Sequence, residues 1–140
     1  LPILALVKHV PDTWSTKTLE ADHTLDRTSV DNVIDEVNEY SVEQALRLRD
    51  DNADAGYEVV ALTMGPAAAD EALRKALAMG ADRGVLIQAD ADLEPLAIAK
   101  LLKAVVDEEQ PDLVLDTAAL SIEQSVAALI ALLQQQGVIR

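Results

Sequence analysis

The sequence predicts an α/β fold: a doubly wound, mainly parallel sheet of four to five strands with helices on both faces. Short apolar runs without a polar face alternate along the chain with longer segments of helical periodicity. Strands of a parallel sheet that are covered on both sides have this composition. Their alternation with helices implies right-handed crossovers between parallel neighbours. We therefore expect one α/β domain over residues 1–140.

The predicted strands are rich in Val, Leu, Ile and Ala. They are residues 3–7, 58–63, 84–87 and 112–115. Half of the chain is hydrophobic, but only 2% is aromatic and Phe is absent. The core must therefore be built from aliphatic side chains and alanine.

The predicted helices lie between and after these runs, at residues 38–51, 67–79, 93–109 and 121–136. Asn38 is the expected N-cap of the first helix. Gly80 suits the C-terminal end of the second, and Pro95 is tolerated in the first turn of the third. The third helix is expected to bury one face, made of Leu96, Ala99, Leu102 and Val106.

A long polar excursion, residues 8–37, follows the first strand. Connections longer than about 12–15 residues without secondary structure are uncommon, and most of them are functional or disordered. We expect an arm here that belongs to the domain.

The charge balance restricts the possible partners. The formal net charge is −14. This charge opposes a nucleic-acid role, because phosphate binding depends on Lys and Arg. It favours protein partners with positive patches. The absence of cysteine excludes disulfides and thiolate chemistry. No signal peptide and no run long enough to span a membrane is visible. We expect a cytoplasmic protein without membrane insertion.

A ligand is expected beyond the carboxyl ends of the strands, where the strand order of such a sheet reverses. The stretch TMGP, residues 63–66, ends a strand and opens a helix. Its helix N-terminus could hold an anion, or the stretch is a tight strand-to-helix turn. Lys8, directly after the first strand, could meet a phosphate or a backbone carbonyl, or be solvated.

Catalytic residues are not expected. His9 has no evident nucleophile as a partner, and the sequence contains no G-x-S-x-G, G-x-G-x-x-G or Walker A motif. The carboxylates are scattered and are interpreted as solubilising charge. We expect no metal site, and Asp90 and Asp92 are the weak alternative for a hard cation.

Six segments carry a resemblance to a known family. VKHVPDTW and TLDR are followed by EYSVEQALRLRD, VVALTMGP, ALRKALAMGADRGVLI and PDLVL. In this order, from about residue 3 to residue 115, they resemble the β subunit of electron transfer flavoproteins. The resemblance implies an adenine-nucleotide-binding fold related to universal stress proteins. It also implies an electron-carrier subunit, not an enzyme, that forms a heterodimer with an FAD-bearing α subunit and serves acyl-CoA or similar dehydrogenases.

The resemblance also implies a cofactor and its site. Family β subunits usually bury a structural AMP, and those of the bifurcating branch bind a second FAD. The positions implied for this nucleotide are Leu6, Val7, Lys8, Asp35, Glu36, Val37, Asn38 and Met64. The family further implies that residues 8–37 form an ordered arm beside the nucleotide and the subunit contact, with Trp14 as a packing anchor.

Two departures from the family pattern bear on this expectation. Family β subunits are much longer, and this chain ends where their C-terminal arm would begin. A Gly-rich phosphate loop is also replaced, because no glycine occurs between Gly84 and Gly137. The polar substitutes there are Thr117, Ser121, Gln124 and Ser125. The alternative is therefore a stand-alone or engineered domain of the same fold that has lost nucleotide and partner binding.

Overall fold

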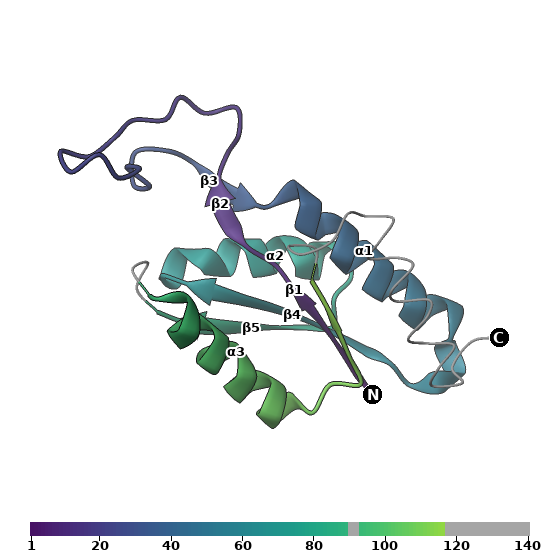
Figure 1. Ribbon diagram of the computed structural model, residues 1–140. Coiled ribbons are helices and arrows are strands. Elements are labelled where there is room, and N and C mark those ends of the chain that lie inside the picture. The colour runs from purple at the N-terminus through teal and green to yellow at the C-terminus, as the bar shows by residue number, and fades with distance from the viewer. Residues whose placement is uncertain (90–92, 117–140) are drawn as a thin grey trace.

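The computed structural model describes residues 1–89 and 93–116, and in this part of the chain the predicted parallel sheet is present (Figure 1). Its four strands are β1 (Pro2–Leu6), β4 (Glu58–Gly65), β5 (Arg83–Gln88) and β6 (Leu113–Leu115). They lie in the order β5-β4-β1-β6, and every neighbouring pair is parallel. Consecutive strands are added on one side of β1 until the chain crosses back to place β6 on its other side. The strand order therefore reverses between β1 and β6.

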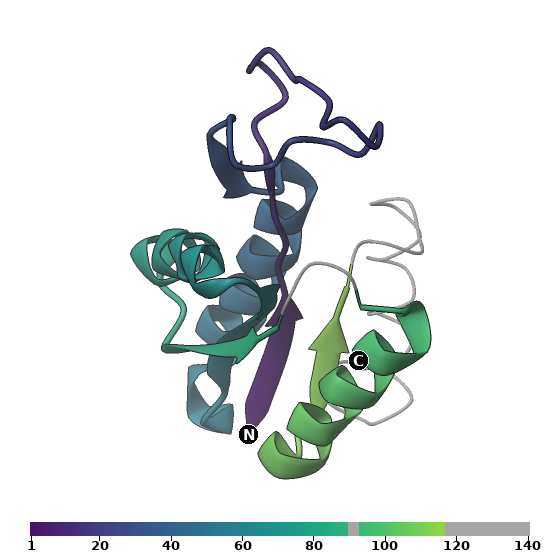
Figure 2. The same cartoon turned by 90° about the vertical axis from the view of Figure 1, so that its left-hand side faces the viewer.

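Helices cover both faces of this sheet, as predicted (Figure 2). One face carries α1 (Glu36–Asp51) and α2 (Asp70–Met79), the latter preceded by the 3₁₀ turn η2 (Ala67–Ala69). The other face carries α3 (Pro95–Glu109). A second 3₁₀ turn, η1 (Ala53–Ala55), follows α1. The helix predicted at residues 121–136 lies outside the described residues.

The core is divided by the sheet because successive side chains of a strand point to opposite faces. Ile3 and Ala5 of β1 pack under α1 and α2 with residues such as Val42 and Leu73. Leu4 faces the other way and packs with Val60, Leu62 and the α3 residues Leu102, Val105 and Val106. Burying each of the larger side chains contributes about 1.5–3 kcal/mol. The core is therefore aliphatic on both faces.

The predicted buried face of α3 is partly wrong. Leu102 and Val106 pack on the sheet, but Leu96 is 68% exposed and Ala99 is also exposed. The helix buries Val105 instead. The expected stripe therefore packs on the sheet in the later turns of α3 but not in its first turns.

The predicted N-cap of α1 is also wrong. The helix begins two residues earlier than expected, and Asp35 caps it by accepting a hydrogen bond from the Val37 N–H at 3.1 Å. Asn38 is buried, and its Oδ1 accepts from the backbone N–H of Lys8 at 2.9 Å. The asparagine amide therefore holds the end of the first strand segment and leaves the capping to Asp35.

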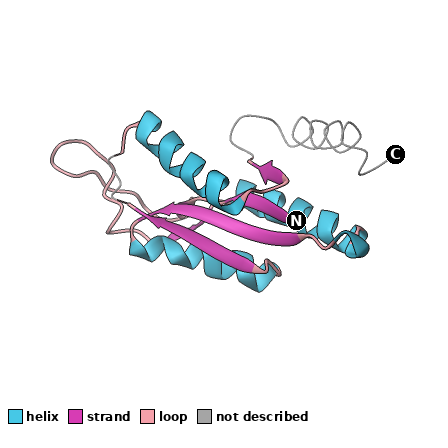
Figure 3. Ribbon diagram, turned by 90° about the horizontal axis from the view of Figure 1, so that it is seen from below, coloured by secondary structure: helices cyan, strands magenta, loops and turns pink. Residues whose placement is uncertain are grey.

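The arm is ordered by a small antiparallel pair and by local turns. Strand β2 (His9–Pro11) pairs with β3 (Asn32–Ile34), and the loop between them extends away from the sheet (Figure 1). Asp22 and Asp26 each accept from the hydroxyl and backbone N–H of a threonine two residues on. The hydrogen bonds from the Thr24 and Thr28 hydroxyls are the main reason why the pKa of each carboxyl lies below its usual range. Figure 3 shows the arm at the end of the sheet toward which β4 and β5 run.

Trp14 does not anchor the arm by packing within this chain. Its side chain is 89% exposed, so a packing role for Trp14 would need a partner and stays a prediction. The turn that carries it is fixed by polar contacts, since the Asp12 carboxylate accepts from the Trp14 N–H at 2.9 Å. Lys17 Nζ donates to three backbone carbonyls of the same turn, those of Asp12, Thr13 and Ser15. The indole is therefore presented to solvent on an ordered turn.

Two arginines tie the helices to the strands at the amino end of the sheet. Arg83 of β5 binds Glu58 of β4 at 2.8 Å and both carboxylate oxygens of Glu109, at the end of α3. The Arg83 guanidinium holds the pKa of Glu109 below its usual range. Arg49 of α1 binds Asp82, before β5, at 3.1 Å. These pairs connect both helical layers to the strand edge.

The Asp82 carboxylate is expected to make stability depend on pH. Burial alone would raise its pKa, but the Val59 N–H, which donates at 2.7 Å, and the Arg49 guanidinium outweigh burial and lower the pKa below 3.8. We expect Asp82→Asn to lower the free energy of unfolding by about 1 kcal/mol at neutral pH, a modest value because the carboxylate is partly exposed. A depressed pKa gives stability that is present above the ordinary pKa and lost as the pH falls through the folded-state value. The difference should therefore begin to shrink once the pH falls below the ordinary carboxyl pKa.

Urea unfolding of both proteins at neutral pH and at about pH 3 measures this difference. Asp50→Asn is the matched control, because Asp50 pairs with the same Arg49 but accepts no amide of the sheet in the contacts of the described residues. A gap between wild type and Asp82→Asn that is equally large at both pH values would contradict the assignment.

Candidate functional site

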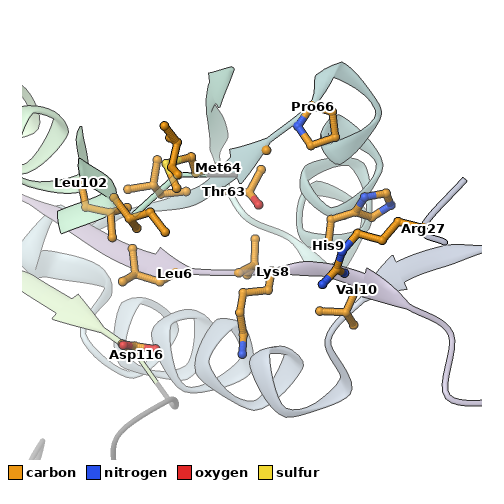
Figure 4. A pocket seen from close by; sticks show the side chains of 15 residues that line it. Leu6, Lys8, His9, Val10, Arg27, Thr63, Met64, Pro66, Leu102 and Asp116 are labelled. Carbon is orange, nitrogen blue, oxygen red and sulfur yellow. The ribbon is translucent and has the colours of Figure 1, made fainter. Parts of the chain in front are cut away.

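A cavity of about 480 Å³ opens beyond the carboxyl ends of β1 and β4, beside the place where the strand order reverses (Figure 4). Open parallel sheets bind ligands at this position, and the volume falls within the range of small-molecule sites. The cavity is lined by Leu6, Val7, Lys8, His9, Val10, Arg27, Leu62, Thr63, Met64, Gly65, Pro66, Leu93, Ile98, Leu102 and Asp116. The lining comes from the strands β1, β2 and β4, the arm, α3 and the end of β6.

The β1 side of the cavity is formed by the segment from Leu6 to Lys8. Val7 N–H donates to the Leu62 carbonyl at 2.9 Å, which extends the pairing with β4 past the strand end. Lys8 N–H donates to Asn38 Oδ1, and the Lys8 carbonyl accepts from the Asp35 N–H at 2.9 Å. The backbone at the cavity wall is therefore fixed by the N-terminus of α1.

The Lys8 ammonium is already compensated by a carboxylate. Its Nζ lies 3.2 Å from Asp35 Oδ2, and the lysine side chain is exposed. Asp35 thus caps α1 and pairs with Lys8 at the same time. A ligand anion at Lys8 would have to compete with this ion pair.

The β4 side contains a buried hydroxyl without a partner. Thr63 is 2% exposed, and its Oγ1 forms no hydrogen bond in the described part of the chain. Figure 4 shows this oxygen directed toward the cavity between β4 and Lys8. Leaving a buried polar group unsatisfied costs about 1–3 kcal/mol. The position therefore carries a donor and acceptor that a ligand could satisfy.

Gly65 and Pro66 complete the β4 side. A Cβ at Gly65 would lie 3.1 Å from the Ala69 Cβ, so the glycine lets the η2 turn approach the strand closely. Pro66 then opens this turn in the extended conformation that precedes a helix. The TMGP stretch is thus a tight strand-to-helix turn whose residues also line the cavity.

One end of the cavity is apolar and the other is charged. At the apolar end, Leu102 of α3 lies near Leu6 and Met64 (Figure 4). Leu93, before α3, and Ile98 of α3 also line the cavity. The side chains of Lys8, His9 and Arg27 lie toward the arm. Asp116 lines the cavity after β6. A ligand with a flat apolar part and an anionic part matches this division.

The structure brings half of the describable predicted site residues to the cavity. Leu6, Val7, Lys8 and Met64 line it. Asp35 and Asn38 lie behind the wall and hold Lys8, whereas Glu36 and Val37 are exposed in the first turn of α1 and do not line the cavity. The remaining predicted positions, Thr117, Ser121, Gln124 and Ser125, lie outside the described residues.

Sequence reasoning missed Thr63, Arg27 and the α3 wall. Thr63 belongs to the TMGP stretch, so a polar residue at the end of an apolar strand was the available signal. Leu93 and Ile98 lie outside the stripe of α3 that the sequence predicted to be buried, so they carried no signal for the site. Arg27 carries no local signal, because only the return of the arm through β3 brings it to the cavity.

The arrangement is suited to binding. Among residues 1–89 and 93–116, no group of three His, Asp or Glu side chains is placed to hold a metal ion. In the same residues no helix is long and apolar enough to cross a membrane. The chemistry on offer is an apolar wall, a buried hydroxyl and cationic side chains.

Comparison with known proteins gives a consistent family. A model of the electron transfer flavoprotein domain matches residues 22–140. The electron transfer flavoprotein subunit beta of Mycobacterium tuberculosis strain H37Rv is 52% identical over 91 residues, which is 63% of this chain and 34% of that protein. The Dictyostelium discoideum protein of the same name is 36% identical over 116 residues, 82% of this chain and 46% of that one.

A plant relative extends the match. The mitochondrial electron transfer flavoprotein subunit beta of Oryza sativa subsp. indica is 43% identical over 120 residues, covering 82% of this chain and 47% of that protein. The chain thus spans between a third and a half of the length of these relatives. The family model and the relatives agree with the parallel α/β fold, and the chain therefore belongs to the electron transfer flavoprotein domain family, in which it is similar to the β subunits.

Proposed function

We propose that the chain is the nucleotide-binding part of an electron transfer flavoprotein β-like module, and that it holds an adenine nucleotide, AMP or FAD, in the cavity beyond β1 and β4. One observation carries the proposal: the cavity joins an apolar wall to a buried, unpartnered Thr63 hydroxyl. A nucleotide base and sugar need this combination of surfaces. The family relationship supplies the adenine class.

The residues present fit such a ligand. Leu6, Met64 and Leu102 offer apolar surface for a flat ring, and Thr63 Oγ1 can donate or accept a hydrogen bond. The backbone of Lys8 is fixed by Asn38, so the wall is formed before the ligand arrives. A preformed wall lowers the entropic cost of binding. The nucleotide is held here and undergoes no reaction at these residues.

The module supports electron transfer through a partner. Flavin cofactors carry the redox chemistry in such proteins, and the protein supplies binding and orientation. We propose that an FAD-bearing α subunit is this partner and that the complex serves acyl-CoA or similar dehydrogenases. The chain itself then acts as a carrier subunit and contributes no catalytic residue. The cytoplasmic location remains a prediction, since a rice relative is named mitochondrial.

Nucleotide occupancy is tested by acid extraction of the purified protein and chromatography of the released material at adenine absorbance. We expect AMP or FAD in a near-stoichiometric amount, or uptake of added AMP by protein purified empty. Protein that is folded, empty and indifferent to both nucleotides would contradict the proposal. That result would favour the alternative of a domain that has lost its ligand.

The Thr63 hydroxyl allows a sharper prediction with two opposite effects. Thr63→Val keeps the shape of the side chain and removes an unsatisfied buried hydroxyl, so we expect the ligand-free protein to unfold at the same or a higher urea concentration. We expect AMP affinity to fall by about three- to tenfold, because one ligand hydrogen bond is lost. Isothermal titration and urea unfolding measure the two effects. Thr63→Ser, which keeps the hydroxyl, is the matched control, and equal AMP affinity in Thr63→Val and wild type would exclude Thr63 from the site.

The exposed Trp14 provides a test of the partner proposal. It is the only tryptophan of the chain, so its fluorescence reports on the arm alone. We expect its emission to shift to the blue or to be quenched when an FAD-bearing α subunit is added, and Trp14→Ala to weaken association by about tenfold, because buried aromatic anchors dominate interfaces. Leu96→Ala is the control, since Leu96 is also exposed but belongs to α3 and not to the arm. An unchanged emission spectrum together with normal association of Trp14→Ala would place the contact elsewhere.

A further inference from the structure

The arm end of the cavity contains two basic side chains that the proposed function has not used. His9, on β2, and Arg27, on the return segment of the arm, both line the cavity. Figure 4 shows the Arg27 side chain reaching from the arm back beside Val10 and His9.

The His9 imidazole is buried with an unsatisfied nitrogen. Its side chain is 9% exposed, and Nε2 has no hydrogen-bond partner in the described chain. The nearby carboxylate is Glu71 on α2, with Oε2 4.0 Å from Nε2, which is too far for a hydrogen bond. Buried polar atoms are normally satisfied. An unsatisfied one at a cavity wall is a position where a ligand atom is expected.

Arg27 is notable because it is unpaired in a strongly acidic chain. The sequence has 25 acidic residues against 11 Lys and Arg, yet Arg27 forms no ion pair with any described residue. Lys8, in the same cavity, is paired with Asp35 at 3.2 Å. Arg27 is therefore the cavity cation that remains available to an anion.

The backbone of Arg27 is held in place by its neighbours. The Asn32 Nδ2 donates to the Arg27 carbonyl at 3.1 Å, and Asp26 immediately before it accepts three bonds from Thr28 and Ser29 backbone and hydroxyl groups at 2.8–3.1 Å. The guanidinium is thus exposed on an ordered support. Binding an anion would therefore have to order the Arg27 side chain but not the backbone of the arm that carries it.

We propose that His9 and Arg27 form an anion subsite that takes a phosphoryl group of the ligand, while its base lies at the apolar end. Guanidinium groups bind phosphate through paired N–H donors, and an imidazole with a proton on Nε2 adds one more. The subsite rests on the proposed nucleotide function for the identity of its ligand. It lies on the arm side of the cavity and uses residues other than those implied by the family resemblance.

The subsite makes the arm a part of the binding site. Arg27 lies far along the chain from β1, which ends at Leu6, and the β2–β3 pair brings it back to the cavity. A bound phosphoryl group would therefore bridge the sheet and the arm. The same ordered loop carries Trp14, so ligand binding is expected to restrain the partner-facing side of the arm.

The first experiment compares two ligands that differ by the phosphoryl group. Titration calorimetry with AMP and with adenosine is carried out on wild type, Arg27→Gln and Lys100→Gln. We expect Arg27→Gln to lower AMP affinity by about tenfold and to leave adenosine affinity unchanged. Lys100→Gln removes the same charge from an exposed, unpaired lysine of α3 that does not line the cavity, and should change neither affinity. Equal loss of AMP and adenosine affinity, or no loss of either, would overturn the subsite.

A second experiment separates the subsite from the nucleotide proposal. The chain has two histidines, His9 and His23, and the exposed His23 is an internal reference for proton NMR. We expect inorganic pyrophosphate at constant pH and ionic strength to shift the His9 ring signals in wild type but not in Arg27→Gln, with His23 unmoved in both. A His9 shift in protein that binds no AMP would retain the subsite and refute the nucleotide function. His9 signals that stay in place, or shift equally in Arg27→Gln, would refute the subsite.

Discussion

Lys8 is the residue through which the sheet, the first helix and the arm are joined, and both of its backbone polar groups are used for this. Its N–H donates to the buried Asn38 side chain, and its carbonyl accepts from Asp35, each at 2.9 Å. Because Asn38 lies in the first turn of α1, the strand end cannot move without the helix. The cavity wall, the base of the arm and the direction of β2 all depend on this junction.

The junction also explains why polar groups at the cavity remain unsatisfied. A chain end that was free to relax would move Thr63 or His9 toward a partner, because an unsatisfied buried polar atom costs about 1–3 kcal/mol. Here the backbone around them is fixed by sheet pairing and by the Asn38 amide. The domain thus keeps two polar atoms unpaired at one cavity. A ligand that forms hydrogen bonds with these two atoms would remove this unfavourable free energy.

Much of the fold could be predicted, because aliphatic runs and helical periodicity are local signals. The sheet strands of the described chain fall within two residues of the predicted ranges at each end. Asn38 was assigned to the cap because its residue type favours that position, but a long-range bond to Lys8 decides its role. Leu96 was placed in the core because two apolar stripes overlap on α3, and packing on Leu4 and Leu62 selected the stripe with Val105.

Only half of the candidate site could be predicted, because the other half depends on contacts between residues that are distant in sequence. Leu6, Lys8 and Met64 follow strands, so a parallel sheet brings them together wherever such a sheet forms. Arg27 is brought there by the β2–β3 pair, whose three-residue strands carry almost no pattern. In a chain of net charge −14, most cationic side chains have a carboxylate partner nearby. A cation without such a partner therefore indicates an anion site better than the mere presence of Lys or Arg does. Lys8 is adjacent to the strand but neutralised by Asp35, whereas Arg27 is remote in sequence and available. The proposed anion subsite therefore depends on Arg27, which only the folded arm can position at the cavity.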